Sequence, residues 1–160
     1  MVKIDDYKEY IWVFTLIGGI LALISIITPI ATNVVTSTLT FYCWTWGILS
    51  VGSQISVLLN SNSVLLFVGL LSAFLILVAV SIIIITVYKM SRNSIKKNLI
   101  GPYWLISGFL IVGALIISIM GLVSYVLSGY IPNFGVFGQV IAAIIVIIGA
   151  YLYIKENPRK

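Results

Sequence analysis

The stretch from Val64 to Tyr88 reads VLLFVGLLSAFLILVAVSIIIITVY and contains no charged residue. A helical run of about 20 apolar residues is long enough to cross the hydrocarbon core of a bilayer. Three further apolar runs occur in the chain, and each is also free of charge. The sequence therefore predicts four transmembrane helices, at residues 10–30, 64–88, 103–127 and 134–154.

The composition also indicates a membrane location. Of the 160 residues, 61% are hydrophobic and 8% are charged, and the mean hydropathy is +1.21. A soluble domain carries about 25% charged residues, so this chain has too few to cover a surface exposed to water. We expect a single integral membrane domain over residues 1–160, of the all-α class, in the cell membrane.

The charged residues predict how the chain is oriented. All nine basic and four acidic residues lie in the first nine residues, in the connector at 89–97 or in the tail from Lys155. Basic residues that flank apolar runs favour the cytoplasmic side. We therefore expect both termini and the connector in the cytoplasm, and residues 32–62 and 128–133 outside. Because the basic residues follow the flanks of the helices, nucleic acid is not an expected partner.

Small residues recur along one side of each apolar run. Helices in lipid associate through close packing at such residues, because lipid supplies no hydrophobic force between them. We expect these stripes to close the four-helix bundle on itself, and the alternative is that one stripe docks a partner subunit. The predicted packing residues are Gly18, Ala22, Gly69, Ala73, Ala114, Ser118, Gly121, Gly138 and Ala142.

The sequence offers little for catalysis or transport. No acidic or basic residue lies inside an apolar run, whereas ion pathways and proton relays depend on such residues. The polar groups expected at depth are Ser and Thr hydroxyls, which can bond to carbonyls of their own helix. An enzyme needs a titratable group or an activated nucleophile. We expect no enzymatic activity, no metal and no cofactor, and a small transporter or channel is the weaker alternative.

Cys43 is the only cysteine of the chain, and the chain has no histidine. An intrachain disulfide is therefore excluded. No basic residue stands near Cys43 in the sequence to lower the pKa of its thiol. We expect a structural thiol or an intermolecular disulfide at this position rather than a nucleophile.

The predicted outer loop, residues 32–62, is uncharged. Residues 34–42 alternate with a period of two and are rich in β-branched residues, which predicts a strand, and a bend at 43–47 would make it a small β-hairpin. Residues 48–59 fit either a strand or a helix. We favour a short helix whose apolar side lies on the bilayer surface.

Aromatic residues cluster in this loop. On a strand, Trp44 and Trp46 would point to the same side, because side chains alternate along a strand. One hypothesis is an aromatic belt at the level of the lipid headgroups. The other is a protein-contact surface, since Trp and Tyr are enriched at interface hot spots. The predicted interaction residues are Phe41, Tyr42, Trp44 and Trp46.

The overall pattern resembles the claudin/PMP22 group of tetraspan membrane proteins. The shared features are four helices, both termini inside, a long first outer loop and a short second one. In that group the first loop carries a Trp, then Gly-Leu-Trp and two cysteines, on a small β-sheet. This chain matches with Trp46 and Gly47 but has Leu49 in place of the last Trp, and Cys43 stands alone. The resemblance implies a non-catalytic role in adhesion, barrier formation or assembly.

The sequence thus predicts a non-catalytic integral membrane protein, surrounded by the lipid bilayer, that works through protein–protein contacts. These contacts would involve the uncharged outer loop and the small-residue helix faces, in a homo-oligomer or a larger membrane complex. The alternative is an accessory subunit of a larger complex of the respiratory, transport or export type.

The predicted orientation can be tested by thiol labelling on a Cys43→Ser background. A cysteine introduced at Ser53 or Asn62 should react with a membrane-impermeant reagent added to intact cells. A cysteine at Asn157 should react only after the membrane is permeabilised, because the basic flanks are expected inside. Labelling of the Asn157→Cys variant in intact cells would contradict the predicted orientation.

Overall fold

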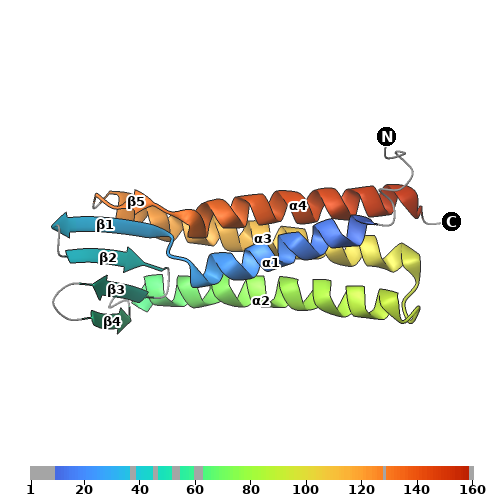
Figure 1. Cartoon of the computed structure of the whole chain (residues 1–160), viewed down its shortest axis with the longest axis horizontal. Coiled ribbons are helices and arrows are strands. Elements are labelled where there is room, and N and C mark those ends of the chain that lie inside the picture. Colours follow the sequence, from blue (N-terminus) through green and yellow to red (C-terminus); the bar gives the residue numbers. More distant parts are fainter. Residues whose placement is uncertain are drawn as a thin grey trace.

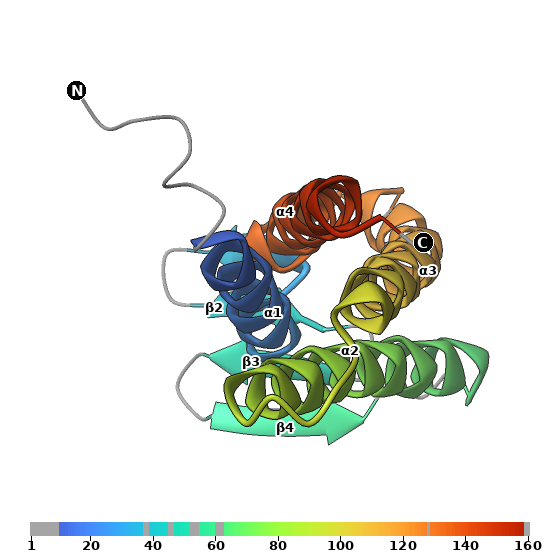
Figure 2. The ribbon, with the colours of Figure 1, turned by 90° about the vertical axis from the view of Figure 1, so that its right-hand side faces the viewer.

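The computed structural model describes residues 10–36, 39–44, 47–51, 55–59, 63–127 and 129–158. Within these residues, four helices run alongside one another and a β-sheet lies beyond one end of them (Figure 1). Seen along the bundle, the helices follow the order α1, α4, α3, α2 (Figure 2). Their bounds are α1 Ile11–Ile27, α2 Ser63–Ser91, α3 Lys97–Val126 and α4 Phe134–Glu156.

Three of the described helices are long and apolar enough to cross a membrane, over Leu66–Ser91, Lys97–Val123 and Phe134–Glu156. Helix α1 is shorter, with 17 residues, because it ends three residues before the predicted limit. Thr28 precedes Pro29 and has φ −84° and ψ 143°, the extended conformation that a residue before proline prefers. Helices α2 and α4 agree with their predicted ranges to within three residues at each end.

The start of α3 differs from the prediction. The helix begins at Lys97, not after Pro102, and Pro102 lies inside it. Proline has no N–H to donate to the carbonyl of Asn98, four residues earlier. However, Ile100 and Trp104 are fully buried on either side of it. Close packing of these two large side chains against the neighbouring helices therefore holds this turn helical despite the missing hydrogen bond.

The sheet has five antiparallel strands in the order β4-β3-β2-β1-β5. Four come from the predicted outer loop, and β5 comes from the connection between α3 and α4. In β5, Pro132 pairs with Ala31 of β1 at the edge of the sheet, where a strand tolerates proline. The strand bounds are β1 Ala31–Thr36, β2 Leu39–Cys43, β3 Gly47–Val51, β4 Ile55–Leu59 and β5 Ile131–Pro132.

Two predictions for this loop are wrong. The single strand expected over 34–42 is two paired strands, because the chain reverses after Thr36 and Thr36 pairs with Leu39. The surface helix expected over 48–59 is instead a second pair of strands, β3 and β4. Pairing of β3 with β2, from Cys43↔Ile48 to Thr40↔Val51, gives the backbone groups of this segment the partners that they need.

Backbone hydrogen bonds join the sheet to the bundle. The Ile30 N–H donates to the Cys43 carbonyl at 2.8 Å, and the Asn133 N–H donates to the Ile30 carbonyl at 2.8 Å. The Gly135 N–H donates to the Pro29 carbonyl at 3.0 Å. A Cβ at Gly135 would lie 2.7 Å from the carbonyl oxygens of Pro29 and Thr28, so the first turn of α4 needs glycine to come this close to the end of α1.

The small-residue stripes face one another within the bundle. A Cβ at Gly18 of α1 would lie 2.7 Å from Cγ2 of Val146 on α4, so these two helices approach closely because Gly18 has no side chain. Ala73 is half-buried. The other predicted packing residues are buried: Gly18, Ala22, Gly69, Ala114, Ser118, Gly121, Gly138 and Ala142.

Polar side chains link α2 to α3 at two levels. The Ser72 hydroxyl donates to the Ala114 carbonyl at 3.0 Å and lies 2.9 Å from the Ser118 hydroxyl. Nearer the other end, Nε1 of Trp104 donates to the Thr86 hydroxyl oxygen at 2.7 Å. Hydrogen bonds between helices keep their register fixed in an apolar environment.

We expect Ala114→Leu to destabilise the bundle. Ala114 is fully buried and its carbonyl accepts the Ser72 hydrogen bond, so three added carbons would force α2 and α3 apart, at a cost of about 1–3 kcal/mol. Ile116→Leu is the matched control on the same helix, because Ile116 is 56% exposed. Unfolding in detergent measures both variants, and equal midpoints would contradict the packing described.

Candidate functional site at the sheet end

The two ends of the molecule differ in charge. No charged residue occurs in residues 10–88 or 98–154, so the sheet and the adjoining halves of the helices are uncharged. The described charged residues lie at the opposite end, where α1 begins, α2 is connected to α3, and α4 ends (Figure 1). We refer to the two ends as the sheet end and the charged end.

The predicted aromatic patch is divided between the two faces of the sheet. Ala31 and Cys43 are paired and fully buried, so their face of the sheet lies against the bundle. Phe41 lies two residues before Cys43 and shares this face, because side chains alternate along a strand. Tyr42 lies on the opposite face. Phe41 and Tyr42 are both half-buried, and they do not form one surface.

Trp44 follows β2 and contacts the end of α1. Its Nε1 donates to the carbonyl of Ile27 at 2.8 Å. Ile27 is the last residue of α1, and the last carbonyls of a helix have no partner within the helix. The Trp44 indole therefore caps α1, which sequence reasoning did not anticipate. Trp46 lies outside the described residues.

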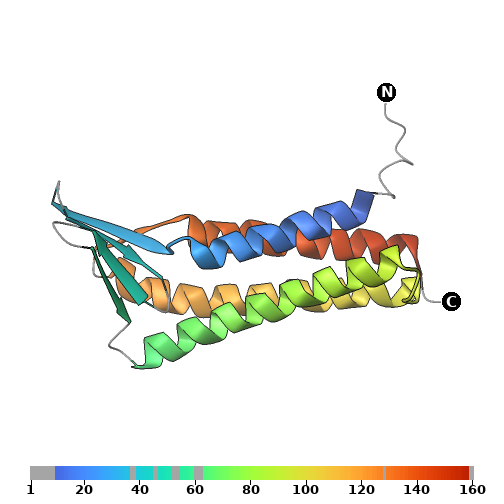
Figure 3. The same ribbon diagram turned by 60° about the horizontal axis from the view of Figure 1, so that its bottom comes forward.

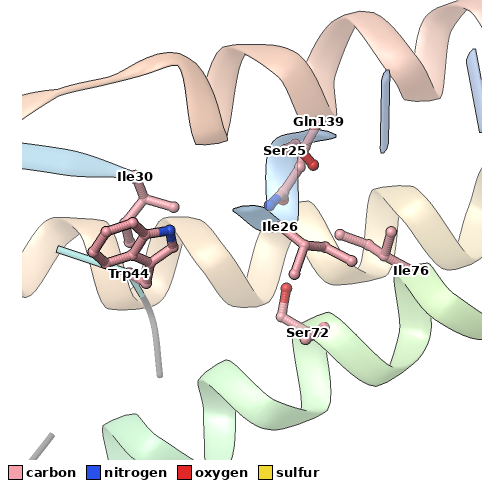
Figure 4. A pocket seen from close by; sticks show the side chains of 8 residues that line it. Ser25, Ile26, Ile30, Trp44, Ser72, Ile76 and Gln139 are labelled. Carbon is pink, nitrogen blue, oxygen red and sulfur yellow. The ribbon is translucent and has the colours of Figure 1, made fainter. Parts of the chain in front are cut away.

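A small cavity lies beneath Trp44, between α1, α2 and α4 (Figure 4). Its volume is about 10 Å³, and polar side chains from three helices line it: Ser25, Ser72 and Gln139. The Ser25 hydroxyl donates to the Ala22 carbonyl at 2.6 Å. Ser72 bonds to α3, so both of these hydroxyls are already engaged.

Gln139 is the residue of this site that sequence reasoning missed. It is 3% exposed, and its Oε1 has no hydrogen-bond partner among the described residues. The expectation that only Ser and Thr supply polar groups at depth is therefore wrong. A single amide changes the hydropathy of a 23-residue helix very little, but one polar residue among the apolar residues of α4 was visible in the sequence.

Cys43 is fully buried and free. Burial raises the pKa of its thiol to about 11, although a hydrogen bond with Tyr130 opposes this shift. Tyr130 lies in the connection before β5, and it packs against a small core of Ile30, Ala31, Cys43 and Val136. A buried, protonated thiol is neither a nucleophile nor accessible to another chain, which favours the structural role over the intermolecular disulfide.

One face of the sheet is turned away from the bundle, and on β1 this face is exposed at Val34. In register, Thr32 pairs with Tyr42 and Val34 pairs with Thr40, and paired residues of antiparallel strands lie on one face. Val34 is 66% exposed. We call this surface the distal face and define it by Thr32, Val34, Thr40 and Tyr42. Its strands project beyond the helix ends (Figure 3).

Within the described residues, no group of three or more His, Cys, Asp or Glu side chains could hold a metal ion. No protein-family model matches this chain, and no curated protein matches it.

We expect Gln139→Leu to stabilise the protein. The substitution removes a buried acceptor without a partner, which costs about 1–3 kcal/mol, and leucine is close to glutamine in size. Phe137→Leu on the same helix is the control, because Phe137 is 56% exposed. A lower unfolding midpoint for Gln139→Leu in detergent would mean that the Gln139 amide makes a stabilising hydrogen bond.

Proposed function

We propose that this protein is a non-catalytic integral membrane protein whose bundle spans the bilayer with the charged end in the cytoplasm. Three long apolar helices support this proposal. The charged end supports it as well: residues 89–156 carry five basic residues, Lys89, Arg92, Lys96, Lys97 and Lys155, and one acidic residue, Glu156. Basic residues concentrate on the cytoplasmic side of membrane proteins. The sheet would then lie outside the cell.

We propose further that the distal face of the sheet binds another protein chain. The observation that carries this proposal is the exposure of Val34 on an uncharged strand, 66% of its surface, on the face that it shares with Thr40 and Tyr42. Apolar patches framed by polar residues mark interaction sites. Thr32 and Thr40 frame this one, and Tyr42 adds the kind of residue that is enriched at interface hot spots.

The two tryptophans have a smaller part in this proposal than the sequence indicated. The N–H of Trp44 is bonded to Ile27 at the end of α1, so it cannot also donate to a partner or to a lipid headgroup. An alanine at Trp44 would damage the cap of α1 together with any interface. The distal face is therefore the better target for a test.

The resemblance to the claudin/PMP22 group remains part of the proposal. It implies a small β-sheet on the first outer loop, and the described part of that loop forms four strands. It also implies a cysteine pair, which this chain lacks because Cys43 is its only cysteine. We propose an adhesion or assembly role of this general type. The partner would be a second copy of this chain or a subunit of a larger membrane complex.

Substitutions at two neighbouring residues of β1 test the interface. We expect Val34→Lys to weaken association by about 10-fold or more, or about 1.4 kcal/mol, because it introduces a charge into an apolar contact. Val35→Lys is the matched control, since Val35 is the neighbouring valine, is 54% exposed and lies outside the distal face. The measurement is the mass of the particle after purification in a mild detergent.

Four outcomes are informative. A wild-type particle that holds several copies of this chain supports self-assembly, and other subunits in the particle support the accessory-subunit alternative. A wild-type particle with one copy of the chain and no other subunit would overturn the proposed contact. Equal masses for wild type and Val34→Lys would exclude the distal face, and both variants should remain in the membrane fraction.

A further inference from the structure

At the charged end, a groove opens between α2 and α3. Its volume is about 480 Å³, within the range of small-molecule sites. The residues that line it are Ile82, Ile85, Thr86, Lys89, Ser94, Ile95, Lys96, Leu99 and Tyr103. Two lysines from different elements and a wall of aliphatic side chains therefore line the same space.

The groove is apolar along its wall and basic at its mouth. Ile82, Ile85 and Lys89 share one side of α2, because residues three, four and seven apart line one face of a helix. Lys89 lies seven residues beyond Ile82, or about 10 Å along the helix axis at 1.5 Å per residue. A ligand that fits this groove has an apolar part beside the isoleucines and an anionic part between Lys89 and Lys96.

The turn between α2 and α3 is held in place by hydrogen bonds and positions Lys89 and Lys96. Asn93 has φ 51°, the left-handed conformation that often ends a helix. The Ser94 N–H and hydroxyl both bond to the Lys89 carbonyl, at 2.9 Å and 3.1 Å. Lys96 then directly precedes the first residue of α3, and the N-terminus of a helix favours negative charge. This turn therefore brings Lys89 and Lys96 into the lining of the same groove.

The hydroxyl of Thr86, which also lines the groove, already makes hydrogen bonds within the protein. The Thr86 hydroxyl donates to the Ile82 carbonyl, at 2.7 Å, and accepts from Nε1 of Trp104, also at 2.7 Å. Trp104 is fully buried and its ring packs edge-on against Tyr153. Thr86 therefore has no hydroxyl proton left for a ligand, which leaves the polar recognition to the mouth.

Charge complementarity identifies the ligand as an anion. Glu156 is the only acidic residue in residues 10–158, and it lines a different cavity, with Met90 and Asn93. A third cavity, between α3 and α4, also holds two lysines, Lys97 and Lys155. However, Lys97 also lines the cavity that holds Glu156, and Lys155 directly precedes Glu156 in the sequence, so an acidic side chain lies near these two lysines.

We propose that the α2–α3 groove binds an anionic phospholipid, with its phosphate between Lys89 and Lys96 and an acyl chain along Ile82 and Ile85. This inference rests on the proposed membrane location, because only a membrane brings such a lipid to the mouth of the groove. Basic pockets between transmembrane helices on the cytoplasmic side bind anionic headgroups. A phospholipid can place an acyl chain along the apolar wall of the groove, whereas a free phosphate has no apolar part to contact it.

The experiment uses the full-length protein in a neutral detergent, with phosphatidylglycerol and phosphatidylcholine as probes. Native mass spectrometry measures how much of each lipid stays bound. We expect wild type to retain phosphatidylglycerol at least about 10-fold more strongly than phosphatidylcholine. The double variant Lys89→Gln, Lys96→Gln should lose this preference. The double variant Lys97→Gln, Lys155→Gln removes the same charge from the other cavity and should keep it.

Each other outcome overturns the proposal. Equal loss in the two double variants would mean that the charge of the whole end attracts lipid and the groove does not. No preference in wild type would mean that the groove binds no anionic lipid. Displacement of phosphatidylglycerol by millimolar inorganic phosphate would mean that the site recognises a free phosphate. Membrane fractionation of the wild type tests the proposed location separately, because loss of lipid binding leaves the protein in the membrane fraction.

Discussion

The close approach of α1 to α4 is the contact on which the rest of the structure depends. It is made by residues without side chains: Gly18 meets Val146, and Gly149 meets the hydroxyl of Thr15 so closely that no Cβ could be placed between them. In lipid, helices gain nothing by hiding apolar surface from each other and associate through dispersion contacts at short range. Glycine therefore determines which helices pair, and isoleucines on other sides of the same two helices face outward, among them Ile20, Ile144 and Ile148.

This pairing also fixes the sheet. Because α1 and α4 lie together, the end of α1 meets the start of α4, and Gly135 comes within hydrogen-bonding distance of the Pro29 carbonyl. The connection that leads into α4 is thereby drawn beside β1 and pairs with it as β5. The sheet is also joined to α1 through Trp44, the residue after β2, whose Nε1 donates to the carbonyl of Ile27, the last residue of α1. The position of the distal face thus follows from helix packing and does not depend on a flexible loop.

The sequence was sufficient to identify the four helices, because each contains a long apolar run and the effect of Pro29 on Thr28 is local, but it misplaced the start of α3. It was not sufficient for the sheet. Residues 48–59 fit a strand and a helix equally well by their local pattern, and pairing with β2 decided between them. The sequence also did not reveal that the register places Phe41 and Tyr42 on opposite faces of the sheet. Gln139 was missed because burial depends on which side of α4 faces α1, and hydropathy does not report that.

The polar groups buried in the bundle differ between its two ends and its middle. Among the described residues, the two buried side-chain acceptors without a partner are Gln139 Oε1, near the sheet, and Asn98 Oδ1, near the charged end. Buried hydroxyls are bonded to carbonyls of their own helix, as Thr15 is to Ile11 and Ser107 is to Tyr103, or of a neighbouring helix, as Ser72 is to Ala114. A conducting path needs polar groups that remain available to a passing ion. The described interior offers none along its middle, whereas the exposed groups of the distal face and of the basic groove lie at its two ends.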